Sequence, residues 1–122
     1  MAGIIMTIPG RRQARLQDQI QAEVAEMVAL ELKDPRIGFA TVTRVDLTSD
    51  LRAAHVWVSV LGDQEARQGT LEGLLAAKGY LRHELSHRLR LRRVPELHFL
   101  LDEAAEDALK IESLLGKDDQ KP

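Results

Sequence analysis

The sequence predicts an α+β domain in which a three-stranded sheet carries helices packed on one of its faces. Apolar residues recur at helical spacing in two long stretches, and three shorter stretches alternate between apolar and polar residues with period two. Proline and glycine separate these stretches. The expected order of elements is helix, strand, strand, interrupted helix, strand, helix. A chain of 122 residues with 44% hydrophobic residues is large and apolar enough for one such domain.

The first helix is expected between Arg11 and Lys33, after a flexible tail of residues 1–10. Its apolar stripe consists of Leu16, Ile20, Val24, Met27 and Val28. Arg11, Arg12 and Arg15 stand at its start, where positive side chains oppose the helix dipole. Because they do not stabilise the helix there, an anionic ligand would account for them. A chance arrangement stays open, since exposed cations at this end cost only about 0.3 kcal/mol each.

Two strands are expected after the first helix, which ends at Asp34-Pro35. The period-two pattern of the first strand places on one face Phe39, Thr41, Thr43, Val45 and Leu47. A turn at Thr48-Ser49-Asp50 follows. The second strand then places on one face Ala54, Val56, Val58 and Val60. Together these segments predict a β-hairpin.

A helix from about Thr70 to Leu91 is interrupted by Ala77-Lys78-Gly79. Its apolar positions are Leu71, Leu74, Leu75, Leu81, Leu85 and Leu89. Gly79 should cost about 1 kcal/mol relative to alanine inside a helix. Small residues flanked by positive charge let a backbone approach an anionic partner closely. A glycine in an ordinary core helix is an equally open interpretation.

The end of the chain is expected to add a third strand and a last helix. The strand contains Leu97, Phe99 and Leu101, and Asp102 can cap the start of the helix. A flexible tail is expected over residues 116–122, so the predicted folded domain covers residues 11–115.

Charge is distributed unevenly, although the formal net charge is only −2. Between Lys78 and Arg93 there are six basic residues against one acidic residue, whereas seven acidic residues face two lysines between Asp102 and Asp119. A basic patch on a neutral body favours one anionic partner bound at one face, and charge segregation without a partner is the alternative. Arginine, lysine and accessible backbone amides bind phosphate groups. The residues that offer these groups are Ala77, Lys78, Gly79, Arg82, Arg90, Arg92 and Arg93.

An enzyme is the less favoured class. His83-Glu84-Leu85-Ser86-His87 matches the H-E-x-x-H pattern of zinc metallopeptidases, in which two histidines bind the metal and the glutamate acts as base. A catalytic zinc also needs a third protein ligand, which no further motif supplies. Both histidines are expected on the solvent side of the helix beside Arg90, which would repel a dication. No metal and no cofactor is therefore predicted.

Cysteine is absent, which excludes disulfides and thiol catalysis and is compatible with the reducing cytosol. No apolar run is long enough to cross a membrane, so no membrane partner is predicted.

Seven short motifs are spread over residues 11–115. They are Asp34-Pro35-Arg36, Thr43-Arg44-Val45, Ser49-Asp50-Leu51, Ala54-His55-Val56-Trp57-Val58-Ser59, Ala77-Lys78-Gly79-Tyr80-Leu81-Arg82, Leu89-Arg90-Leu91-Arg92 and Pro95-Glu96-Leu97-His98-Phe99. Together they resemble the bacterial ribosome-binding factor A family, which has a KH-like fold of type II. In that family an A-x-G break stands where other KH domains carry the GXXG loop that clamps single-stranded RNA. The chain departs from the family in its last helix, where Ala108 and Lys110 replace a usual glycine and basic residue.

The resemblance implies a non-enzymatic assembly factor of the cytoplasm that acts as a monomer. It implies binding to the small (30S) ribosomal subunit and its 16S rRNA during late maturation and rRNA processing, with a link to growth in the cold. The seven residues named above as phosphate binders would clamp the RNA backbone, and Arg11, Arg12 and Arg15 would form a second basic edge. A KH-like module that binds protein instead of RNA is the remaining alternative.

Overall fold

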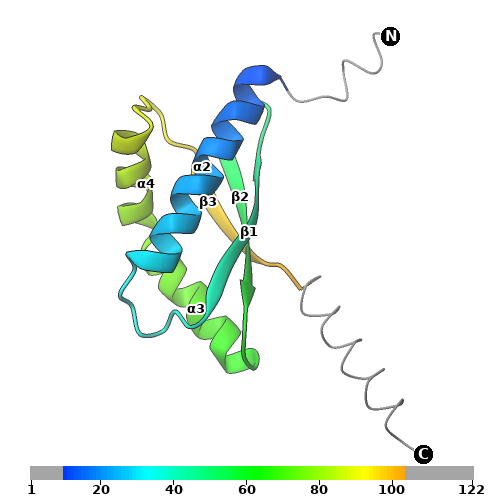
Figure 1. The fold of residues 1–122 in the computed structure, drawn as a ribbon, viewed down its shortest axis with the longest axis vertical. Helices are drawn as coiled ribbons and strands as arrows, with labels where there is room; N and C mark the ends of the chain where they lie inside the picture. The colour runs from blue at the N-terminus through cyan, green and yellow to red at the C-terminus, as the bar shows by residue number, and fades with distance from the viewer. Residues whose placement is uncertain (1–9, 104–122) are drawn as a thin grey trace, which may run out of the picture.

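The computed structural model describes residues 10–103 of the chain. Their elements, in chain order, are α2 (Arg11–Leu30), β1 (Ala40–Leu47), β2 (Ala53–Val60), α3 (Gln64–Ala76), α4 (Lys78–Arg88) and β3 (Glu96–Leu101), as Figure 1 shows. This order confirms the prediction up to the third strand. The expected tails over residues 1–9 and 116–122 and the helix expected after Asp102 lie outside the described residues.

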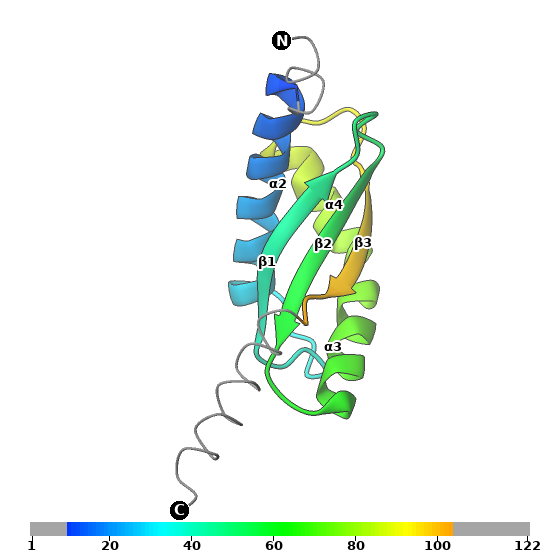
Figure 2. The same ribbon diagram turned by 90° about the vertical axis from the view of Figure 1, so that its right-hand side faces the viewer.

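The sheet has the strand order β1-β2-β3. β1 and β2 form an antiparallel hairpin, whereas β2 and β3 are parallel, with Ala53 opposite Glu96. Parallel neighbours need a crossover connection, and α3 and α4 supply it. Figure 2 shows the described helices behind the sheet and none of them on the face turned to the viewer, which confirms one helix-covered face.

The core lies between the covered face of the sheet and the helices. The predicted stripe of α2 is confirmed at Ile20, Val24, Met27 and Val28, which are all buried. Other large buried side chains include Val45, Val56, Val58, Val60, Leu74, Leu81, Leu85 and Leu97. These apolar contacts fix α2 and α4 on the same side of the sheet.

The prediction of one shared face for alternate residues from Phe39 to Leu47 was wrong in its first half. Phe39 is 81% exposed and Thr41 is also exposed, whereas Val42 is buried. A β-bulge between Val42 and Arg44 explains the difference, because one extra residue reverses the side on which the following side chains lie. The period-two pattern therefore holds only after the bulge, where Val45 and Leu47 are buried.

The boundaries of the interrupted helix also differ from the prediction. α3 begins at Gln64, six residues before the expected Thr70, because the Asp63 carboxylate accepts a hydrogen bond from the Ala66 amide at 2.9 Å. At the other end, α4 stops at Arg88 instead of Leu91. The segment from 89 to 95 is consequently a loop, and this loop carries three of the predicted site residues.

A row of glutamines on α2 forms hydrogen bonds with backbone groups at the outer edge of β1. The Gln13 amide donates to the Leu47 carbonyl at 2.7 Å, and the Leu47 N–H donates to Gln17 Oε1 at 2.9 Å. Gln21 Oε1 accepts from the Val45 N–H at 3.3 Å. The three glutamines are four residues apart and so lie on one helix face. They align α2 with the strand and cover backbone groups that an edge strand otherwise exposes.

Candidate nucleic-acid interface

The predicted break is present at Ala77, which ends α3 and precedes α4. Its backbone stays near the helical region, with φ −86° and ψ −2°, so the two helices meet at a bend and not at a loop. Gly79 is exposed, and a Cβ added there would meet nothing within 4 Å. At Gly73 the same Cβ would lie 2.5 Å from Ile37 Cγ1. Close packing therefore explains Gly73 but does not explain Gly79.

The two cations beside the break are used within the domain. Lys78 forms an ion pair with Glu96, and Arg82 Nη1 lies 3.7 Å from the same carboxylate. The Arg82 guanidinium also donates to the Val94 carbonyl at 3.1 Å and, at 3.4 Å, to that of Pro95. The hydrogen bond from Lys78 holds the pKa of Glu96 below its ordinary value. These contacts fasten the start of α4 to the start of β3.

Six other predicted site residues are exposed arginines without such partners. Within residues 10–103, no side-chain hydrogen bond or ion pair is formed by Arg11, Arg12, Arg15, Arg90, Arg92 or Arg93. Figure 1 shows the start of α2 in blue and the loop after α4 in yellow at the same end of the molecule. The fold thus brings together the two basic groups that the sequence had suggested separately.

A hollow of about 360 Å³ lies where these segments meet the β1–β2 turn. Arg12, Arg90, Arg92 and Arg93 line it, and a second hollow of about 260 Å³ lies among Arg11, Arg12 and Arg15. The first turn of α2 carries no acidic residue, and the N-cap Gly10 offers no side chain. The free N–H groups and positive dipole of this helix end add to the attraction for anions.

Two residues lining the first hollow have left-handed backbone conformations. Leu51 has φ 63° and Arg90 has φ 53°, a region that L-residues other than asparagine and aspartate rarely adopt. Arg90 follows Leu89, the C-cap of α4, and the Leu91 N–H donates back to the Ser86 carbonyl at 3.0 Å. This is the Schellman arrangement, in which glycine is the usual residue at the position of Arg90. Strained backbone is concentrated at functional sites in many proteins, and here both strained residues face one cavity.

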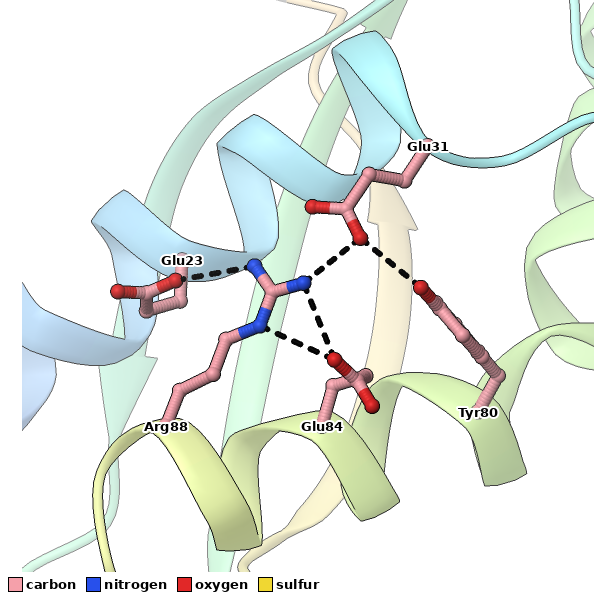
Figure 3. A network of polar contacts seen from close by, with 5 residues as sticks. All are labelled: Glu23, Glu31, Tyr80, Glu84 and Arg88. Carbon is pink, nitrogen blue, oxygen red and sulfur yellow. Dashed lines mark hydrogen bonds and ion pairs between the residues drawn. The ribbon is translucent and has the colours of Figure 1, made fainter.

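A network around Arg88 holds α4 against α2, as Figure 3 shows. Its guanidinium pairs with Glu31 at 2.7 Å, Glu84 at 3.1 Å and Glu23 at 3.2 Å. The Tyr80 hydroxyl donates to the same Glu31 oxygen at 2.9 Å. Hydrogen bonds from Arg88 and then Tyr80 lower the pKa of Glu31, while its carboxylate raises the pKa of Arg88. The network sets the position of the basic loop that follows α4.

The histidine motif of α4 lies on the solvent side, as predicted. His83 and His87 are exposed, and their ring centroids are 4.5 Å apart. Among the described residues, no three histidine or acidic side chains are grouped so as to hold a metal ion. Glu84, the base of the peptidase motif, is instead bound to Arg88. Nothing in this geometry supports the peptidase interpretation.

Comparison with known proteins gives a consistent result. The ribosome-binding factor A family model matches residues 12–115. A ribosome-binding factor A from Thioalkalivibrio sulfidiphilus is 46% identical over 106 residues, covering 87% of this chain and 82% of the relative. The chain belongs to the ribosome-binding factor A family.

Structures of the family agree with the fold. The crystal structure of ribosome-binding factor A from Thermus thermophilus has 34% identity and a TM-score of 0.67, covering 75% of this chain and 97% of that one. A Thermus thermophilus homology model fitted into a cryo-EM map of a 30S complex has 34% identity and a TM-score of 0.63, covering 75% and 96%. The predicted α+β, KH-like architecture is therefore confirmed.

Sequence reasoning missed part of the site in this member of the ribosome-binding factor A family. Asp50 and Leu51 line the hollow from the β1–β2 turn, and Leu91 lines it from the loop after α4. The turn was predicted, but nothing in its residue types indicates that it meets the start of α2. The left-handed conformation of Arg90 also leaves no signal, because glycine is the residue that would have marked it.

Proposed function

We propose that this protein is a ribosome assembly factor that binds the small ribosomal subunit and its 16S rRNA during late maturation. Membership of the ribosome-binding factor A family carries this conclusion. A similar protein from Thermus thermophilus has been fitted into a map of its complex with the 30S subunit. The function is that of a binding factor without catalysis, and its place of action is the cytoplasm, where the ribosomes of bacteria are assembled.

The six arginines that are unpaired within residues 10–103 are proposed as the main contacts to rRNA phosphates. Arginine binds phosphate with two parallel N–H groups, and such contacts position a protein on RNA without reading its sequence. Arg12 and Arg90 represent the two segments that contribute these arginines. Neither must break an ion pair within residues 10–103 before it binds.

The break at Ala77-Lys78-Gly79 is proposed as a second contact, at the other end of α4. The 11 residues of this helix span about 16 Å, so the two contacts suit successive parts of one RNA strand. At the break the exposed Gly79 backbone is free to approach RNA. Lys78 and Arg82 take part only if a phosphate competes with Glu96 for them.

Cosedimentation with small ribosomal subunits at two salt concentrations tests the proposal. The double variant Arg12→Glu/Arg90→Glu should bind more weakly. Its slope of log affinity against log salt should fall by about 1 for each phosphate group that the variant no longer binds. Lys33→Glu is the matched control, because Lys33 is exposed beyond the far end of α2, about 30 Å from Arg11.

Four outcomes are informative. Loss of binding in the double variant with normal binding of the control supports the arginine surface. Equal binding by all three proteins would show that this surface does not contact the subunit. Absence of wild-type cosedimentation would contradict the assembly function itself. Binding that survives RNase digestion of isolated complexes would favour the protein-interaction alternative.

Gly79→Ala tests the second contact separately. The added methyl group enters open space and improves helix propensity, so the domain should stay folded and become slightly more stable. If RNA backbone lies against Gly79, the methyl group should nevertheless weaken subunit binding. Unchanged binding would remove the break from the interface and leave the arginine surface alone.

A further inference from the structure

The hollow at the end of the domain has a chemistry that phosphate binding alone does not explain. Arg12 and Arg90 line it, but leucines contribute the apolar part of its lining and Asp50 adds a carboxylate. A carboxylate among arginines weakens binding of a phosphate, because like charges repel. The hollow therefore suits a ligand that combines a phosphate, an apolar surface and a hydrogen-bond donor.

The leucines Leu16, Leu51 and Leu91 come from three different segments and are only partly buried. Leu16 and Leu51 also pack against the hydrophobic core, which fixes their positions. Their apolar surface, partly open to solvent within a basic hollow, offers contact to a flat ring. The volume of about 360 Å³ lies at the lower end of the range of roughly 300–1,000 Å³ for small-ligand sites. That size fits one nucleotide and is too small for a duplex.

Asp50 is oriented so that one oxygen stays available. Its Oδ1 accepts hydrogen bonds from the Thr48 hydroxyl at 2.7 Å and the Arg52 N–H at 3.1 Å. No other residue within 10–103 donates a hydrogen bond to Oδ2. These hydrogen bonds, from Thr48 first, lower the pKa of Asp50, so the carboxylate is ionised at neutral pH and can only accept.

We propose that this hollow binds a single unpaired nucleotide of the RNA. Its base lies on Leu51 and Leu91, its phosphate lies between Arg12 and Arg90, and a base N–H group donates to Asp50 Oδ2. Single-stranded and bulged nucleotides are the parts of RNA whose bases can leave the stack in this way. The proposal rests on the proposed function and assigns a base-binding role to the end of α4 opposite the A-x-G break.

The left-handed conformation of Leu51 makes a clean test available. Leu51→Asn removes the apolar contact but keeps a residue type that tolerates φ 63°, so lost packing is offset by relieved backbone strain. Leu61→Asn is the matched control. Leu61 is a leucine that is 63% accessible, and it follows the other end of β2, about 26 Å away along the strand. Thermal unfolding of both variants verifies that they fold.

The full-length protein is titrated with two labelled RNA hairpins of equal length, one fully paired and one with a single unpaired 2-aminopurine nucleotide. Wild type should bind the second hairpin about tenfold more tightly, which corresponds to about 1.4 kcal/mol. The fluorescence of the 2-aminopurine should change on binding. Leu51→Asn should abolish both effects, and Leu61→Asn should preserve them.

Asp50→Asn distinguishes a nucleotide pocket from a plain phosphate site, because the two kinds of site predict different changes in RNA affinity. It retains an oxygen for Thr48 and Arg52 but removes a negative charge. Affinity for paired RNA should therefore rise, while the preference for the unpaired nucleotide should fall. The proposal is overturned if wild type shows no such preference, or if the preference survives in Leu51→Asn. Cosedimentation with small subunits in either case would leave the assembly function intact.

Discussion

Arg90 allows stability and binding to be separated at one position. It occupies the C′ position after α4 with φ 53°, where glycine is the usual residue. We predict that Arg90→Gly and Arg90→Ala lose RNA binding equally, because both remove the guanidinium. They should differ in stability, because only glycine adopts this conformation without strain.

The expected difference follows from two opposing terms. An L-residue in the left-handed region costs about 1–2 kcal/mol. Glycine loses more conformational freedom on folding, which costs about 0.5–1 kcal/mol relative to alanine. Arg90→Gly should therefore be about 1 kcal/mol more stable than Arg90→Ala. In a domain of this size, such a difference raises the melting temperature by roughly 4–8 °C.

Calorimetry or chemical denaturation measures the stability of the two variants, and cosedimentation with small subunits measures their binding. If Arg90→Ala proves as stable as Arg90→Gly, the left-handed conformation of residue 90 is refuted. If the glycine variant binds distinctly better than the alanine variant, the guanidinium is not what the RNA contacts. The wild type should resemble Arg90→Ala in stability and exceed both variants in binding.

Three further predictions concern the scaffold. Gly73→Ala should destabilise the domain by about 1 kcal/mol, because the new Cβ would lie 2.5 Å from Ile37 Cγ1. The double variant Gly73→Ala/Ile37→Ala should recover part of this loss, as measured by urea denaturation. Gln17→Leu should lower the free energy of unfolding by about 1–3 kcal/mol in the same assay. It removes Gln17 Oε1, which accepts a hydrogen bond from the Leu47 N–H at 2.9 Å. Hydrogen bonds from Arg36 lower the pKa of Asp34 from 3.8 to about 2. The contribution of the Asp34 carboxylate to the free energy of unfolding is therefore complete above pH 4 and is lost as the pH falls towards 2. Asp34→Asn should flatten an acid-unfolding curve in that window.

The order of elements was predictable because it depends on local patterns. The stripe of α2 and the alternation of β2 are regular over whole elements, and both are reproduced in the structure. The face of β1 was not predictable in its first half. A bulge adds one residue without changing the residue types around it, so Thr41 and Val42 exchange sides without a signal in the sequence.

The sequence predicts which basic residues the candidate site contains, but it does not predict which of them are paired with carboxylates. A count of nearby charges identified Lys78 and Arg90 equally, since both are cations in one basic stretch. The structure distinguishes them, because Lys78 meets Glu96 across 18 positions of sequence while Arg90 meets no carboxylate within residues 10–103. Pairing over such a separation depends on the crossover between β2 and β3, which brings the start of α4 beside β3.

A shortage of acidic residues does not explain why six arginines form no ion pair within residues 10–103. Those residues include 14 aspartates and glutamates and 14 lysines and arginines. Carboxylates are paired in the structure with Arg36, Arg44, Lys78, Arg82 and Arg88. Arg88 alone holds three of them and thereby fixes α4 on α2. The domain therefore uses its ion pairs to hold the scaffold, and the repulsion among the arginines at its end is left for a partner to relieve. RNA binding at these arginines breaks no ion pair within the described residues, whereas binding at Lys78 must first displace Glu96. Removing the charge of Arg12 or Arg90 should therefore lower RNA affinity more than Lys78→Ala does.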